Sequence, residues 1–160
     1  MRRLFTHPLI VRHPENLTAH WAQQVINKHS NNTVVNRVKI ISVDTGTTTR
    51  VRLKVTHNNP NSFPKYWFIK IPSLNWRARA ITALPRLLHT ETRFYTDLAK
   101  NIPTQIPIAL SAKSQFSRGS TIALNDITEQ GYTAGHPSDT LSVEQAENII
   151  EQLATLHATF

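Results

Sequence analysis

One lysine stands inside a stretch that is otherwise suited to a buried β-strand. In YWFIKI, residues 66–71, Lys70 has apolar side chains before and after it. Burying an unpaired ammonium is costly, so Lys70 needs a carboxylate or phosphates nearby, or must extend along the sheet edge to water. Glu91 is the obvious carboxylate, because helical periodicity places it on a helix that follows the strand.

Changes in hydrophobic periodicity predict the elements that position these two side chains. Apolar residues at helical spacing predict helices over residues 17–29 and 86–100, the first with Asn16 or Thr18 as its N-cap. Five segments have the pattern of strands: 34–43, 49–57, 66–71, 106–113 and 120–127. Gly46 lies in the short turn between the first two strands, and as a glycine it can take positive φ angles there. The order predicts an α+β fold with a five-stranded antiparallel sheet.

A last helix is predicted after residue 142. Ser142 and Gln145 form a capping box, and apolar residues follow at helical spacing. They are Ala146, Ile149, Ile150 and Leu153. No glycine, proline or cationic last turn ends this helix before Phe160, which favours a chain that is a truncated product or a fragment.

Composition limits the classes of function. The 160 residues suffice for one domain, and a net charge of +8 predicts attraction to anions without saying which. The absence of cysteine excludes disulfides and thiol nucleophiles and fits a cytoplasmic location. No segment approaches the apolar length of a membrane span, so we expect no membrane partner. The eight histidines show no H-E-x-x-H or similar spacing, so we expect no metal site.

A lysine on the third strand and a glutamate on the following helix form the plan of a kinase nucleotide-binding lobe. Three stretches resemble the amino-terminal part of the aminoglycoside phosphotransferase-like superfamily, closest to its ecdysteroid kinase-like and related bacterial branch. They are GTTTRVRLKV, FIKIPSLNWRARAITALPRLLHTETRFYTDLA and LSVEQAENIIEQLATLHATF. The resemblance extends from about Leu17 to Phe160.

The resemblance implies an ATP-dependent small-molecule kinase fold in which Lys70 binds phosphates and Glu91 is its helix partner. It also implies that DTGTTTR, residues 44–50, is the loop over the nucleotide, where backbone N–H groups and threonine hydroxyls reach phosphates. The residues of that loop assigned to the nucleotide are Gly46, Thr47, Thr48 and Thr49. By itself the same loop is equally a plain hairpin turn.

The resemblance further implies that backbone groups near Asn125 and Ile127 meet adenine, although the family commonly has glutamate at the position of Asn125. It divides the chain into an N-terminal extension (1–16), a nucleotide-binding N-lobe (17–128), and a hinge with the start of a C-lobe helix (129–160). The H-x-D catalytic segment and the metal-binding aspartate of the family's second lobe do not occur here. We therefore expect no catalytic residue, no activity from this chain alone, and Mg²⁺ only if a second lobe is supplied.

The partners expected are a nucleotide, together with either a second copy or a separately encoded C-lobe bound through the last helix. The rival interpretation is a small basic binding module, with nucleic acid as a candidate ligand. It would use Arg50, Arg52 and Lys54 on one face of a strand and the arginines after Trp76. No nucleic-acid-binding motif accompanies this charge, so we regard nucleic acid as an unlikely partner.

Overall fold

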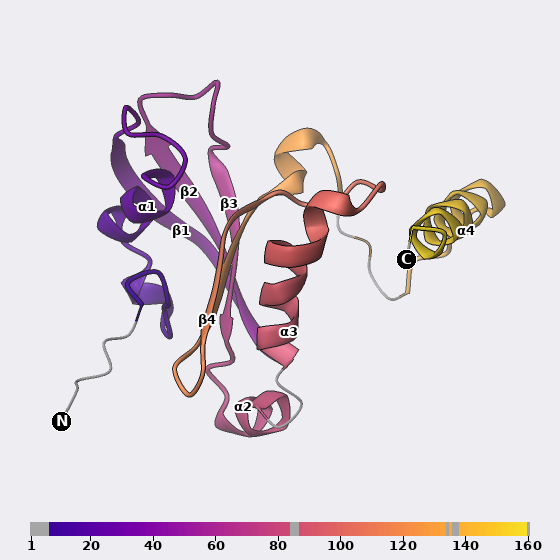
Figure 1. The fold of residues 1–160 in the computed structure, drawn as a ribbon, viewed down its shortest axis with the longest axis horizontal. Coiled ribbons are helices and arrows are strands. Elements are labelled where there is room, and N and C mark those ends of the chain that lie inside the picture. The colour runs from indigo at the N-terminus through magenta and orange to yellow at the C-terminus, as the bar shows by residue number, and fades with distance from the viewer. Residues whose placement is uncertain (1–6, 84–86, 134, 136–137, 160) are drawn as a thin grey trace.

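The computed structural model describes residues 7–83, 87–133, 135 and 138–159 (Figure 1). Its centre is one antiparallel sheet with the strand order β1-β2-β3-β5-β4, which confirms the predicted α+β fold and five-stranded sheet. The strands are β1 (Val35–Thr45), β2 (Thr48–His57), β3 (Tyr66–Pro72), β4 (Ala109–Gln115) and β5 (Gly119–Asn125). The β1–β2 hairpin thus supplies one edge of the sheet and the β4–β5 hairpin the other.

Helices flank the sheet. The α-helices are α1 (Ala19–Ile26), α2 (Trp76–Ala83), α3 (Leu87–Arg93) and α4 (Val143–His157). Short 3-10 helices cover Pro14–Asn16 (η1), Ala99–Asn101 (η3) and Ile127–Gln130 (η4), and a π-helical turn covers Phe94–Leu98 (η2). Thr18 is the N-cap of α1, where its side chain accepts a hydrogen bond from the amide of Trp21. Of the two N-cap candidates, Thr18 is therefore the one used.

Two local predictions need correction. The helix expected over 86–100 is α3 followed by the π-helical turn and η3, and α2 was not predicted because its sequence WRARAITA has no continuous apolar stripe. The last strand ends at Asn125 rather than 127, because Asp126 caps η4. Of the described glycines, Gly119 in the β4–β5 turn has φ of 109° and Gly131 has φ of 85°, whereas Gly46 does not use the positive φ angle that is open to it.

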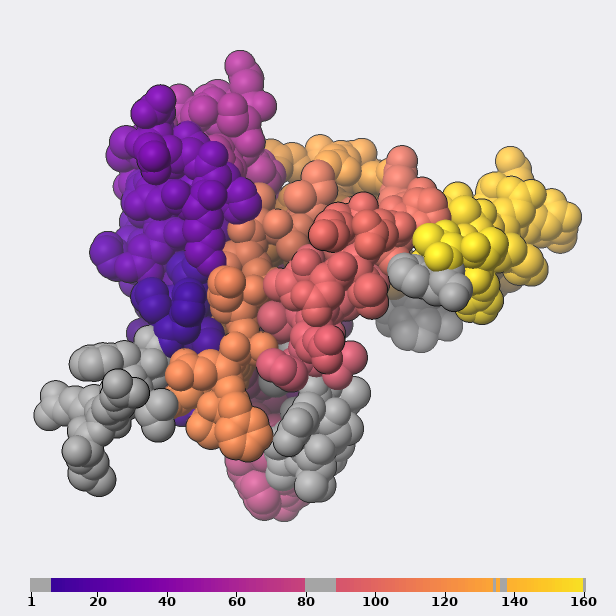
Figure 2. All heavy atoms as spheres, in the orientation of Figure 1, coloured from indigo at the N-terminus to yellow at the C-terminus, as the bar shows by residue number. Residues whose placement is uncertain are grey.

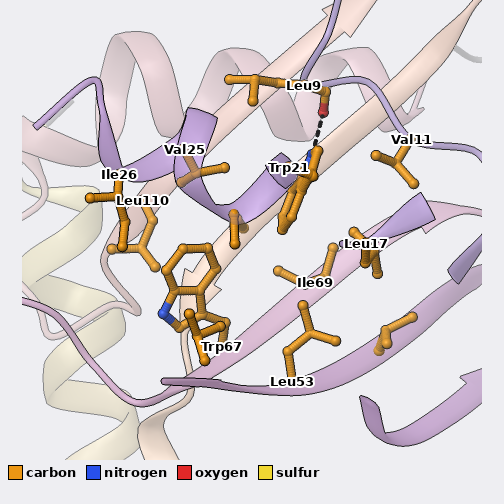
Figure 3. Packing of buried hydrophobic residues seen from close by; sticks show 14 of the residues in the cluster. Leu9, Val11, Leu17, Trp21, Val25, Ile26, Leu53, Trp67, Ile69 and Leu110 are labelled. Atoms are coloured by element: carbon orange, nitrogen blue, oxygen red, sulfur yellow. Dashed lines mark hydrogen bonds between the residues drawn. The ribbon is translucent and has the colours of Figure 1, made fainter. Parts of the chain in front are cut away.

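The main core lies between the sheet and α1. Val51, Leu53 and Val55 of β2 point into it, as the alternation of the sequence predicts. Figure 3 shows Trp21 of α1 against this face, with its indole N–H donating to the carbonyl of Leu9. The opposite face of the sheet carries a smaller cluster, formed by Ala112, Ile122 and Leu124 with the partly buried Phe68, Tyr95 and Ala109. The side of the sheet that α3 covers is therefore less filled with apolar side chains than the α1 side.

Helix α4 lies apart from the sheet, at one side of the molecule (Figures 1 and 2). The predicted capping box is confirmed, since Ser142 accepts from the Gln145 amide and the Gln145 side chain accepts from the Ser142 amide. Four of its large apolar side chains are exposed, Ile150 to 64%; the others are Val143, Ile149 and Leu153. Among the described residues, no helix has the length and apolar character needed to cross a bilayer.

Candidate functional site

The ammonium of Lys70 forms an ion pair with Glu91. Lys70 Nζ lies 2.5 Å from Glu91 Oε1, and each side chain is 28% exposed. Lys70 leaves β3 on the face that α3 covers, opposite the main core, and α3 presents Glu91 to it. The predicted ion pair is confirmed, and it explains how a strand of mostly apolar residues tolerates a charge.

The surroundings of the pair are partly apolar. Tyr95, one turn after Glu91, packs on the cluster of Ala112, Ile122 and Leu124. Burial raises the pKa of Tyr95, and the charge of Glu91 raises it further. The pair therefore stands at the margin between an apolar cluster and water, where a charge interaction is stronger than in bulk solvent.

The β1–β2 turn lies beyond Lys70 along the same sheet. In the β2–β3 register Arg50 is opposite Lys70, and Thr48 is opposite Pro72. The carbonyl of Gly46 accepts a hydrogen bond from the Ser73 hydroxyl, at 2.7 Å. The turn is thus fastened to the segment that follows β3, which fixes its position relative to Lys70.

The threonines of this turn differ in their surroundings. Thr47 is exposed and Thr48 half-buried, whereas Thr49 is buried, with its hydroxyl accepting a hydrogen bond from the Leu74 amide. The structure brings Gly46, Thr47 and Thr48 to the surface near Lys70. It places Thr49 in a structural contact instead, because Thr49 points to the opposite face from Arg50.

Another ion pair joins β2 to the segment after β5. Arg52 Nε lies 2.7 Å from Asp126 Oδ2, and its Nη2 donates to the Thr128 hydroxyl. The amide and hydroxyl of Thr128 both donate to Asp126. Burial alone would raise the pKa of Asp126, but the hydrogen bonds from Arg52 and Thr128 outweigh it and hold this pKa below its usual range. Sequence reasoning missed this pair, because nothing in the chain predicts the pairing of β2 with residues 74 positions later.

The residues assigned to adenine lie next to this ion pair. The side chain and amide of Asn125 are both bonded to Ile108: Oδ1 accepts from the Ile108 amide, and the Asn125 amide donates to its carbonyl. Ile127 is half-buried and begins η4. Asn125 therefore fastens β5 to the start of β4, and the adenine contact stays a prediction.

The cationic face predicted on β2 exists, but its charges are partly compensated. Arg50 contacts Asp44 at 2.5 Å, Arg52 is bound to Asp126, and the Lys54 ammonium lies 5.8 Å from the centre of the Tyr66 ring. Arg77 stacks on the exposed Trp76. Within the described ranges, no three histidine, aspartate or glutamate side chains gather as metal ligands would.

Comparison with known proteins yields one family. The family model described as the ecdysteroid kinase-like family matches residues 45–159, well over half of the 160 residues. The matched segment includes Lys70, Glu91 and the turn at Gly46. No curated protein and no solved structure gives a significant match to the chain.

Proposed function

The chain belongs to the ecdysteroid kinase-like family, and on that premise we propose that it is the nucleotide-binding lobe of an ATP-dependent small-molecule phosphotransferase, as in the aminoglycoside phosphotransferase-like superfamily. The observation that carries the proposal is the ion pair of Lys70 with Glu91. In kinases a strand lysine held by a helix glutamate binds the ATP phosphates. Here β3, α3 and the fastened turn at Gly46 supply the same chemical groups.

The residues present fit the polyphosphate of a nucleotide. Lys70 is a partly exposed cation oriented by Glu91, and an exposed glycine turn lies along the same sheet. A Cβ on Gly46 would lie 3.7 Å from Arg50 Nη2, so a guanidinium adjoins this turn. Thr47 and Thr48 would add hydroxyl donors. The backbone near Asn125 and Ile127 would meet adenine at the other end of the face.

Phosphoryl transfer also needs a base for the acceptor hydroxyl and carboxylates for Mg²⁺. The H-x-D segment of the family does not occur in this sequence. We assign the base and the Mg²⁺ carboxylates to a second lobe, either in the same polypeptide or separately encoded. That lobe, or a second copy of this chain, would bind the exposed apolar side chains of α4. This chain alone would bind ATP in the cytoplasm without transferring its phosphate.

Calorimetric titration of the purified chain with ATP tests the proposal. We expect binding that Lys70→Ala removes and that Glu91→Gln weakens, since Glu91 orients the ammonium. Lys54→Ala is the matched control, because it removes a cation from the same sheet face while leaving the Lys70 pair intact. Equal affinities for the three variants, or no ATP binding by the wild-type chain, would contradict the proposal.

The rival function, a basic nucleic-acid-binding module, has less support. It depends on charge, and two of the three β2 cations assigned to it are held by carboxylates of the same chain. Tight, salt-sensitive binding to single-stranded nucleic acid, unaffected by Lys70→Ala, would favour it over the kinase lobe.

A further inference from the structure

Two cations of the sheet stand directly opposite each other. Arg50 of β2 and Lys70 of β3 are partners in the antiparallel register, so their side chains leave the same face side by side. Like charges in directly opposed positions repel, and a sheet that keeps them needs compensating anions. The compensation here comes from outside the pair, from Asp44 for Arg50 and from Glu91 for Lys70.

The resulting row crosses the sheet in the order carboxylate, guanidinium, ammonium, carboxylate. Asp44 is on β1, Arg50 on β2 and Lys70 on β3, and Glu91 reaches the row from α3. The two cations are adjacent in the middle, and each carboxylate lies at an end. An anion placed between Arg50 and Lys70 would therefore be attracted by both cations and would lie closer to them than to either carboxylate.

Arg50 is held more loosely than its neighbour Arg52. The side chains of Arg50 and Asp44 are 47% and 66% exposed, and ion pairs of that exposure contribute little to stability. The Asp126 side chain that binds Arg52 is only 5% exposed. An incoming anion can thus replace Asp44 at Arg50 at small cost, while Arg52 stays bound.

The guanidinium of Arg50 also adjoins the turn. Its Nη2 is 3.7 Å from the point where a Cβ on Gly46 would stand. A group bound to Arg50 would therefore lie against the exposed backbone of the turn, where glycine leaves room for close approach. Arginine offers a planar pair of donors to a phosphate, whereas lysine acts as a point charge.

We infer that Arg50 and Lys70 form a two-cation clamp that selects nucleoside di- and triphosphates over monophosphates. The inference rests on the proposed function and adds to it a second phosphate-binding residue and a ligand preference. One phosphate group binds Lys70, and a neighbouring group binds Arg50 in place of Asp44. A monophosphate engages one of the two cations and gains less.

The test compares the affinities of the chain for ADP, AMP and inorganic tripolyphosphate, measured by calorimetry. Arg50→Gln should weaken ADP and tripolyphosphate binding at least about tenfold, the usual effect of losing a charged hydrogen bond, and change AMP binding less. Arg50→Lys should restore part of the loss. Lys54→Gln, on the same strand and face, is the matched control and should leave the ADP-to-AMP ratio unchanged.

Asp44→Asn separates the clamp from a merely structural role of Arg50. If Arg50 only fastens the hairpin through Asp44, Asp44→Asn and Arg50→Gln should weaken polyphosphate binding alike. The clamp predicts the opposite sign, because Asp44→Asn removes the intramolecular competitor and should retain or strengthen binding. A shift of the Arg50 Nε–Hε resonance on adding tripolyphosphate to the wild-type chain should accompany binding.

Each outcome has a distinct meaning. ATP binding that depends on Lys70 but is unchanged by Arg50→Gln overturns the clamp and leaves the proposed function standing. Equal weakening by Asp44→Asn and Arg50→Gln also overturns the clamp. No binding of ATP to the wild-type chain overturns the clamp and the proposed function together. Loss with Arg50→Gln and no loss with Asp44→Asn supports the clamp.

Discussion

Replacing Asp126 with alanine should destabilise the lobe more than removing any exposed acidic side chain. The Asp126 carboxylate accepts from Arg52 Nε at 2.7 Å and from the amide and hydroxyl of Thr128 at 3.1 and 2.8 Å. It is therefore both the N-cap of η4 and the only carboxylate shown at Arg52 in the described part of the chain. Asp126→Ala removes all three acceptor contacts at once.

The size of the loss follows from these contacts. A lost N-cap costs about 1 kcal/mol, and a hydrogen bond to a charged group contributes about 1.5–3 kcal/mol. The Arg52 side chain is 40% exposed, so water replaces part of its lost contact and the second figure must be reduced. We expect Asp126→Ala to lower the free energy of unfolding by about 2–3 kcal/mol.

Urea unfolding followed by tryptophan fluorescence measures this loss, because Trp21 and Trp67 are buried and become exposed on unfolding. Asp44→Ala is the matched control: it also removes an arginine-bound aspartate, but from an exposed pair, and should cost about 0–1 kcal/mol. Equal losses for the two variants would show that the burial of Asp126 does not make its contacts stronger.

The same site predicts a dependence on acid. The pKa of Asp126 is lower in the folded chain than its ordinary value, so its contribution is complete above that ordinary value and is lost as the pH falls toward the folded pKa. The stability difference between wild type and Asp126→Asn should therefore decrease below about pH 4. A difference that grows on acidification would contradict the assignment.

The remaining predictions concern the turns, α4 and activity. Gly119→Ala should lower the free energy of unfolding by about 1–3 kcal/mol, since Gly119 has φ of 109° and an added Cβ would lie 2.9 Å from Pro72 Cγ. Gly46→Ala should lower it by less than about 1 kcal/mol. Urea unfolding measures both losses, and a larger loss for Gly46→Ala would contradict the conformation of these two turns. Ile150→Gln should reduce the self-association that light scattering detects at micromolar concentration, because it removes an exposed apolar side chain of α4. A wild-type chain that is already purely monomeric would contradict this prediction. With ATP and sugars, aminoglycosides or steroid alcohols, the chain alone should release no ADP. If the wild-type chain does release ADP and the Lys70→Ala variant does not, no second lobe is needed.

Local signals made much of the fold predictable. The alternation in β2, the apolar strand around Lys70 and the capping box at Ser142 each depend on residues close in sequence, and the structure confirms all three. The ion pair of Lys70 with Glu91 was predictable because a buried ammonium needs a carboxylate and few candidates followed the strand.

Features that depend on long-range register were not predictable in the same way. The opposition of Arg50 and Lys70 depends on how β2 aligns with β3, and the contact of Arg52 with Asp126 on how β5 joins that sheet. Sequence reasoning named only Gly46 as a glycine that can take a positive φ angle, whereas Gly119 and Gly131 are the glycines that have one. Thr49 looked like a phosphate donor until the structure showed it buried.

The most direct test of a nucleotide-binding lobe is a map of amide resonance shifts on adding ATP to the ¹⁵N-labelled chain. We expect shifts concentrated at the turn of Gly46 and Thr47, around Lys70, and at the segment from Asp126 to Thr128. These three regions lie on or beside one sheet face, and we therefore expect a single ligand to shift all three. Shifts centred instead on Arg37 and Lys39 of the edge strand β1, or no shifts at millimolar ATP, would contradict a nucleotide site at Lys70.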